Sequence, residues 1–181
     1  MDHLVAQLAH HEPGVGGLNP TQAFSQVEVV NGSAGLLGQS GKQLRQKFVA
    51  QVVLQAAEAV DAQDYDAFVA LFTEDATLVR PGGPELKGRA EILQAYRSKD
   101  PHRMTHHLIC NHQVTLTEPN KASSRCKVLL YASDQRRELT PKGRPADAQQ
   151  MAGVIQDALI LTAEGWKIQS RRAWFELLIQ A

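Results

Sequence analysis

Apolar residues recur at helical spacing between about residues 48 and 96. Steps of three and four residues predict one helix that begins after Gly41 and runs to about Val60, a short second helix from Tyr65, and a third that opens at Gly88. Asp64 stands directly before the second helix, where its side chain can accept hydrogen bonds from the free N–H groups of the first turn. The pattern therefore predicts three helices in this region.

The spacing becomes strand-like after residue 103, and the apolar runs are long. Runs 104–117 and 122–133 flank a Glu-Pro-Asn-Lys turn, and runs 151–162 and 166–179 flank an Ala-Glu-Gly turn, so each pair is predicted to form an antiparallel hairpin. Helices followed by strands are typical of an α+β fold. Long strands twist and curl, and three helices cover only part of the concave face, so we expect a pocket for a small ligand.

Composition narrows the possible partners and compartment. The 19 Lys and Arg residues equal the 19 Asp and Glu residues, so no net field favours nucleic acid or anionic lipid, and neither is expected as a partner. No stretch reaches the roughly 18 apolar residues that a membrane helix needs, and residues 1–14 lack the features of a secretory signal. Cys110 and Cys126 lie in neither a CxxC nor a metal-type spacing. We therefore expect a cytoplasmic protein with reduced thiols.

The first 41 residues differ from the rest of the chain. Glycine and proline interrupt every period there, and only a short stretch between the breaks could form a strand. We predict that residues 1–41 form a flexible extension or an arm that packs on a neighbouring subunit, and that residues 42–181 form one domain.

Several segments, in this order, resemble the SnoaL-like branch of the nuclear transport factor two superfamily. They are VDAQDYDAF at 60–68, LFTEDA at 71–76, GRAEI at 88–92, THHLICN at 105–111, and GWKI at 165–168 followed by Arg171 and Arg172. The resemblance implies a cone formed by a curled antiparallel sheet and three N-terminal helices, a cystatin-like roll, and a homo-oligomer, either a dimer or a trimer. Enzymes of the superfamily include scytalone dehydratase, bile acid dehydratases, ketosteroid isomerase and polyketide cyclases. They move a proton beside a carbonyl group in a water-poor cavity, and no cofactor is expected.

The resemblance implies a catalytic pair, His107 and Asp61. His107 falls where the dehydratases place their histidine, and Asp61 matches a carboxylate that could orient or charge-stabilise the imidazole. Asn111 follows His107 by four residues, so a regular strand would turn both side chains to the same face, toward the substrate. Without catalysis, His107 would be a buried histidine held by a partner, and Asp61 would cap a helix end or form a turn.

Further residues are assigned to substrate binding: Tyr65, Tyr96, Tyr131 and Phe68. The three tyrosines are candidate donors to an oxyanion. Two positions depart from the dehydratase pattern: the tyrosine expected five residues before the aspartate is Ala56, and the second carboxylate of bile acid dehydratases is Leu130. Both losses remove polar groups that such a mechanism would use.

Other polar and aromatic residues receive structural interpretations. Asp157 and Arg171 are predicted to face each other across the last hairpin as an exposed or half-exposed ion pair. Trp166 and Trp174 are an even number of residues apart on the same predicted strand, so both should lie on one face of the sheet, and they are predicted to pack against the helices. The histidines near residue 107 alternate in direction along a strand, so no metal site is expected from them.

The leading hypothesis is a cofactor-independent lyase or isomerase, of dehydratase or cyclase type, acting on a small, mostly apolar carbonyl compound. The first alternative is a non-catalytic β-type subunit of a ring-hydroxylating dioxygenase, because three segments resemble those subunits as well. The second alternative is a module that binds a small ligand without altering it.

Overall fold

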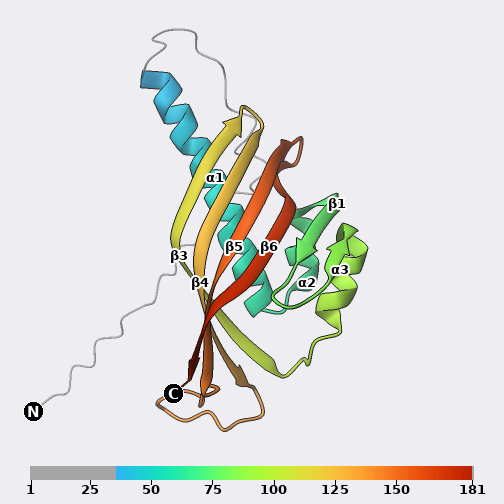
Figure 1. Cartoon of the computed structure of the whole chain (residues 1–181), viewed down its shortest axis with the longest axis vertical. Helices are drawn as coiled ribbons and strands as arrows, with labels where there is room; N and C mark the ends of the chain where they lie inside the picture. The colour runs from blue at the N-terminus through green and yellow to red at the C-terminus, as the bar shows by residue number, and fades with distance from the viewer. Residues whose placement is uncertain (1–35, 181) are drawn as a thin grey trace, which may run out of the picture. The chain divides into compact units, whose positions relative to one another are not determined.

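The computed structural model of the protein describes residues 36–180. Within this range the helices precede most of the strands (Figure 1). The elements are α1 (Leu36–Asp61), α2 (Tyr65–Ala70), β1 (Phe72–Val79), β2 (Glu85–Lys87), α3 (Gly88–Arg97), β3 (Arg103–Glu118), β4 (Lys121–Asp134), β5 (Gln149–Thr162) and β6 (Gly165–Gln180). The prediction for residues 1–41 lies largely outside the described residues.

Helix α1 begins at Leu36, so the predicted start after Gly41 is wrong. Gly41 lies inside the helix, and the space where a Cβ would stand is open. A glycine inside a helix costs only about 1 kcal/mol relative to alanine, and a 26-residue helix that packs along one face tolerates that cost. The buried face includes Val49, Val53 and Ala56, none of which is accessible to solvent.

The short elements after α1 follow the expected order. Asp64 caps α2 as predicted, since its Oδ1 accepts a hydrogen bond from the Ala67 N–H at 2.9 Å. Helix α2 ends at Ala70, and Phe72, which shares its helical spacing, instead begins β1. Helix α3 opens at Gly88 as predicted, and the positive φ of 75° explains why a glycine stands there.

The six strands form one curled sheet in the order β2-β1-β6-β5-β4-β3. Both predicted hairpins, β3–β4 and β5–β6, are present, and their strands pair antiparallel. The sheet is mixed rather than wholly antiparallel as expected, because β1 pairs with β6 in parallel. This pairing joins strands far apart in sequence, and no turn sequence indicates it. Helix α1 crosses the concave face, while α2 and α3 lie beside β1 (Figure 1). The predicted α+β fold with a curled sheet and three helices is confirmed.

A bulge in β3 changes which side chains face the helices. The register with β4 shifts between Cys110 and Gln113, and Asn111 has a φ of 48°. A bulge inserts an unpaired residue and resets the alternation of side chains. Asn111 is therefore exposed, while His112 turns inward and lies 2.7 Å from the Ser124 hydroxyl. The expectation that Asn111 shares the face of His107 is wrong.

A second bulge acts in the same way on β6. The register with β5 shifts where Ile168 pairs with Leu159 and Ser170 pairs with Ala158. Trp166, before the shift, is buried in the core as predicted, but Trp174 lies beyond it, partly exposed, with its ring 5.3 Å from the Arg125 guanidinium. The prediction that both tryptophans pack on the helices is wrong for Trp174.

Candidate active site

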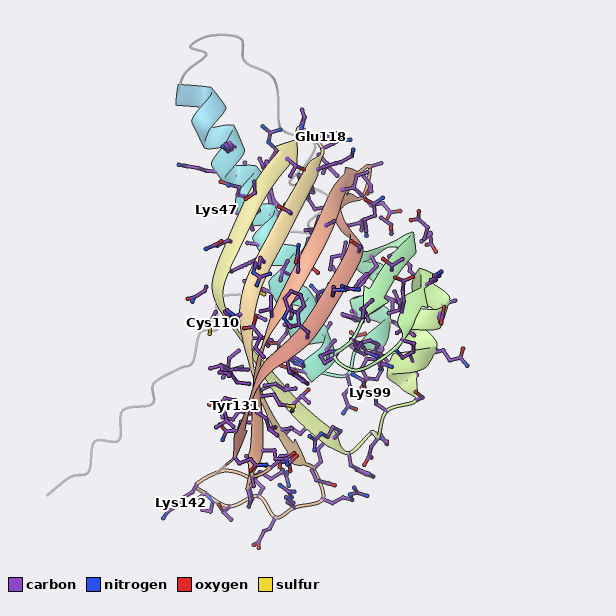
Figure 2. All side chains as sticks on the ribbon, in the orientation of Figure 1. Lys47, Lys99, Cys110, Glu118, Tyr131 and Lys142 are labelled. Carbon is purple, nitrogen blue, oxygen red and sulfur yellow. The ribbon has the colours of Figure 1, made fainter. Side chains whose placement is uncertain are left out.

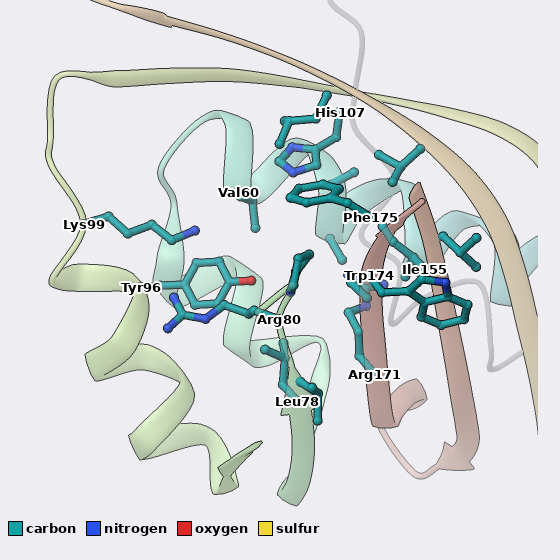
Figure 3. A pocket seen from close by; sticks show the side chains of 18 residues that line it. Val60, Leu78, Arg80, Tyr96, Lys99, His107, Ile155, Arg171, Trp174 and Phe175 are labelled. Atoms are coloured by element: carbon teal, nitrogen blue, oxygen red, sulfur yellow. The ribbon is translucent and has the colours of Figure 1, made fainter. Parts of the chain in front are cut away.

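A cavity of about 200 Å³ lies between α1, β1, α3 and the sheet (Figure 3). Apolar side chains form most of its wall, among them Val60, Leu78, Val128, Leu130 and Ile155. Five polar side chains also line it: Arg80, Tyr96, Lys99, His107 and Arg171. Typical sites for drug-sized ligands measure roughly 300–1,000 Å³, so this cavity suits a small compound.

Asp61 and His107 are in direct contact at this cavity. Asp61 is the last residue of α1, and His107 stands on β3, which packs against that helix. The His107 Nδ1 lies 2.6 Å from Asp61 Oδ1, and the His107 main-chain N–H donates to Asp61 Oδ2 at 2.7 Å. The Thr105 hydroxyl also donates to Asp61 Oδ1, at 2.7 Å. Three donors therefore hold one carboxylate against the imidazole.

The hydrogen bonds around Asp61 determine which ring nitrogen of His107 carries the proton. Burial raises the pKa of the Asp61 carboxyl, but the hydrogen bonds from His107 and Thr105 together bring it below its ordinary value of 3.8. The carboxylate is therefore ionised at neutral pH and can only accept hydrogen bonds. Because Nδ1 faces this acceptor, Nδ1 carries the proton of the neutral ring, and Nε2 carries a lone pair.

Tyr96 brings a hydrogen-bond donor to the same cavity. Its residue surface is 7% exposed, and Figure 3 shows the hydroxyl pointing into the cavity. The ring is fixed by contacts with Phe68 and Tyr65, whose ring centroids lie 4.6 and 5.7 Å away. Burial raises the pKa of Tyr96, so the hydroxyl stays protonated. No hydrogen bond joins this hydroxyl to another residue in the part of the chain that the structure describes.

The other residues assigned to substrate binding lie elsewhere. Phe68 is fully buried in the core, so it cannot touch a ligand, and that assignment is wrong. Tyr65 lines an adjoining cavity that shares Lys99 with the first. Tyr131 stands opposite His106 in the β3–β4 register, on the face of the sheet away from His107. Of the three tyrosines, Tyr96 is the one that lines the main cavity.

The two positions that depart from the dehydratase pattern lie at the cavity. Ala56 and Leu130 both line it, and Leu130 pairs directly with His107 across β3 and β4. An alanine and a leucine leave the wall apolar where a phenol and a carboxylate were expected. The cavity therefore has no carboxylate at residue 130 to accompany the Asp61 and His107 pair.

Asp157 and Arg171 form the predicted cross-strand pair, but the pair is buried. They are paired in the β5–β6 register, and the guanidinium binds both carboxylate oxygens, at 2.7 and 2.9 Å. Their exposed fractions are 2% and 7%, so the expectation of an exposed pair is wrong. Both side chains face the core because they lie on the inner face of a curled sheet. Arg171 also lines the cavity, with its charge already balanced.

Sequence reasoning missed Arg80 and Lys99 as cavity residues. Arg80 follows β1 at the start of a turn in which the Gly83 N–H donates to the Arg80 carbonyl at 3.0 Å. Lys99 follows α3 and is exposed as a residue, although its ammonium lies over the Tyr96 ring. The Pro-Gly-Gly-Pro signal at 81–84 marked the turn, but no sequence period gives the direction of a side chain outside regular elements.

Among residues 36–180 no three His, Cys, Asp or Glu side chains gather closely enough to hold a metal ion. None of the helices in the described part of the chain is both long and apolar enough to cross a membrane.

Comparison with known proteins gives one family and many structures of the same fold. A model of the SnoaL-like domain family matches residues 45–172. A candidate scytalone dehydratase from Novosphingobium aromaticivorans is 16% identical, with a TM-score of 0.67 over 79% of this chain and 91% of that one. A candidate aromatic ring hydroxylase, also from Novosphingobium aromaticivorans, is 24% identical, with a TM-score of 0.61 over 76% and 93% of the two chains. A type 2 hexachlorocyclohexane dehydrochlorinase is 13% identical, with a TM-score of 0.65 over 77% and 90%. No match was found among curated proteins.

Proposed function

The chain belongs to the SnoaL-like domain family, and from this premise we propose that it is a cofactor-independent lyase or isomerase, of dehydratase or cyclase type. Its substrate is a small carbonyl compound that enters the cavity beside His107. The observation that carries the proposal is the ionised Asp61 carboxylate, which accepts a hydrogen bond from the Nδ1–H of His107 and so leaves Nε2 as a base for the cavity.

In the proposed reaction, His107 Nε2 removes a proton from the carbon beside the substrate carbonyl. The electron pair of that C–H bond moves toward the carbonyl oxygen, and an enolate forms. The imidazolium then returns the proton. In a dehydration the proton goes to a hydroxyl group on the next carbon, the C–O bond breaks, and water leaves. In an isomerisation the proton goes to another carbon.

Two features of the cavity favour this chemistry. The protonated Tyr96 hydroxyl can donate to the enolate oxygen, since a donor already fixed in the cavity stabilises charge as it develops. The wall of Val60, Leu130 and Ile155 is apolar and lowers the local dielectric constant, which strengthens each electrostatic interaction beside it. Asp61 stabilises the imidazolium that forms on His107.

The names of matched structures support a lyase or an isomerase. They include a candidate dehydratase and a dehydrochlorinase, whose names describe eliminations, and a ketosteroid isomerase-like protein. The identities of the first two to this chain are 16% and 13%, so the substrates of those proteins are not transferred to it.

Proton abstraction can be tested without the natural substrate. 2-Tetralone has acidic protons beside its carbonyl, and their exchange with deuterium oxide can be followed by proton NMR. The protein is expected to accelerate this exchange, and His107→Ala is expected to reduce the acceleration by about 10²–10⁴-fold, the usual contribution of a positioned acid or base. His106→Ala is the matched control, because His106 is the preceding residue of β3 and is exposed.

The same assay separates the alternatives. If His107→Ala exchanges protons as fast as the unmodified protein, His107 has no role in proton transfer. If the ketone binds but exchange never exceeds that of buffer, the small-ligand module is the better account. Stable co-purification with an iron–sulfur oxygenase subunit would favour the β-type subunit instead.

A further inference from the structure

We propose that the substrate of this cavity carries an anionic group, such as a carboxylate, and that Arg80 and Lys99 bind it. This inference rests on the proposed function, because it describes the compound on which His107 would act. It changes the expected substrate from a mostly apolar compound to one with a charged end. The anionic group and the reacting carbonyl would occupy different parts of the same cavity.

Arg80 and Lys99 are held at one aromatic ring. The Lys99 Nζ lies 3.9 Å from the centroid of the Tyr96 ring, and the Arg80 Cζ lies 5.5 Å from it. Figure 3 shows the ring between the two cationic side chains, within the cavity that also contains His107. Arg80 is further fixed by a hydrogen bond of 3.3 Å from its Nη1 to the Ala95 carbonyl. Both charges are therefore positioned before any ligand binds.

Neither cation has a carboxylate partner among residues 36–180. Other cations near the cavity differ in this respect, because Arg171 binds the buried Asp157 and Arg103 binds Asp147 at 2.6 Å. Two unpaired positive charges beside an apolar wall repel each other, and they leave hydrogen-bond donors for a ligand. A carboxylate at the edge of the Tyr96 ring would be attracted by both charges and would reduce the repulsion between them.

The titration of Lys99 agrees with this arrangement. Burial of its ammonium end, together with the charge of Arg80, lowers the pKa of Lys99 to about 8, and the Asp61 carboxylate opposes this shift. Tyr96 also faces the ammonium, but its hydroxyl is neutral because burial raises its pKa. A bound anion would add a negative charge beside Lys99 and favour its protonated form.

The proposal is tested by equilibrium binding of two probes of nearly equal shape, 2-naphthoate and 2-naphthamide. Isothermal titration calorimetry should give tighter binding of the carboxylate than of the amide. Arg80→Gln and Lys99→Gln should each weaken 2-naphthoate binding on the order of fivefold to tenfold and leave 2-naphthamide binding unchanged. Lys142→Gln is the matched control, since Lys142 is an exposed cation on the loop between β4 and β5, away from Lys99 (Figure 2).

Three results would overturn the proposal. The first is equal affinity of the unmodified protein for the two probes. The second is an equal loss of both probes in Arg80→Gln and Lys99→Gln, which would mean lost packing rather than lost charge. The third is a loss of 2-naphthoate binding in Lys142→Gln as large as in Lys99→Gln, which would mean a general effect of net charge.

A pH series adds an independent readout. Protonated Lys99 attracts the anion, so affinity for 2-naphthoate is expected to fall as the pH rises through about 8, and this fall should be absent in Lys99→Gln. A fall of equal size in Lys99→Gln would contradict the role of Lys99.

The binding test also separates this inference from the proposed function. Binding needs no turnover, so His107→Ala should keep the preference for 2-naphthoate even though it loses proton exchange. If the preference holds in a protein that never exchanges protons, the anion site stands and the proposed reaction fails. If 2-tetralone exchanges protons but the preference is absent, the reaction stands and the anion site fails.

Discussion

Asp61→Asn removes one negative charge from the proposed active site while keeping the shape of the side chain. The carboxylate accepts three hydrogen bonds, from Thr105, from the His107 ring and from the His107 main chain. The asparagine oxygen can accept from the main-chain N–H, and its amide group can donate to the Thr105 hydroxyl and to His107 Nδ1. That arrangement satisfies every group, but it moves the ring proton of His107 from Nδ1 to Nε2.

The two effects of this substitution differ in size. Proton exchange on 2-tetralone is expected to fall by about 10²–10⁴-fold, because Nε2 becomes a donor and can no longer remove a proton. The free energy of unfolding is expected to fall by only about 1–3 kcal/mol, since three hydrogen bonds to a charged acceptor become bonds between neutral groups, at about 1 kcal/mol each. The variant should therefore remain folded and be almost inactive.

The pH dependence of the unfolding free energy provides a second measurement. The folded-state pKa of Asp61 lies below its ordinary value of 3.8, so its carboxylate stabilises the fold above that value, and this stability is lost as the pH falls through the folded-state pKa. The difference in unfolding free energy between the unmodified protein and Asp61→Asn should be largest at neutral pH and should decrease toward zero as the pH falls below the folded-state pKa of Asp61. Urea unfolding at several pH values measures it.

The matched control is Asp64→Asn. Asp64 caps α2 through the Ala67 N–H, outside the cavity, and asparagine caps helices about as well as aspartate does. Proton exchange and stability should both be nearly unchanged in this variant. If Asp61→Asn keeps more than half of the exchange rate, or if Asp64→Asn loses as much as Asp61→Asn, the proposed role of Asp61 is refuted.

Three further outcomes are expected from other parts of the structure. Asp157→Ala leaves the Arg171 guanidinium buried without its partner and should lower the unfolding free energy by about 3–5 kcal/mol in urea, whereas a loss below 1 kcal/mol would mean that water reaches the site. Gly88→Ala should lower the unfolding free energy by about 1–2 kcal/mol because the φ of Gly88 is 75°. Gly41→Ala should raise it by up to about 1 kcal/mol, since the space around Gly41 in α1 is open. Thermal unfolding that reverses this order would contradict the assigned conformations. Burial raises the pKa of Cys126 to about 11, so dithionitrobenzoate at pH 8 should label one of the two thiols in the folded protein and both in urea; two rapidly labelled thiols without urea would show that Cys126 is accessible.

Much of the fold could be predicted because its signals are local. The spacing of apolar residues gave the three helices, and short turns gave both hairpins. Asp64 was predictable as a cap because capping depends on a few neighbouring residues. The contact between Asp61 and His107 was expected from the resemblance alone, since these residues are 46 positions apart and no local signal joins them.

Two of the failed predictions depended on the strand register inside the hairpins, and a third depended on helix packing. In a regular strand, alternate side chains lie on opposite faces of the sheet, so a residue's face can be predicted from its position in the strand. This prediction fails beyond a bulge, because the bulge adds a residue. Asn111 and Trp174 both lie at or beyond such a shift. Phe68 was assigned to substrate binding, but its burial against Tyr96 depends on how α2 and α3 pack together.

The sequence by itself determined which elements form, because apolar spacing, caps and turns act over a few residues. Only the tertiary structure decided what those elements enclose. The long curled strands bring the end of α1, the turn after β1 and the residues after α3 to one cavity, and Arg80 and Lys99 meet there at the Tyr96 ring. Whether a charge is balanced depends on neighbours that are distant in sequence, so the paired Arg171 and the unpaired Lys99 could be told apart only in the folded protein.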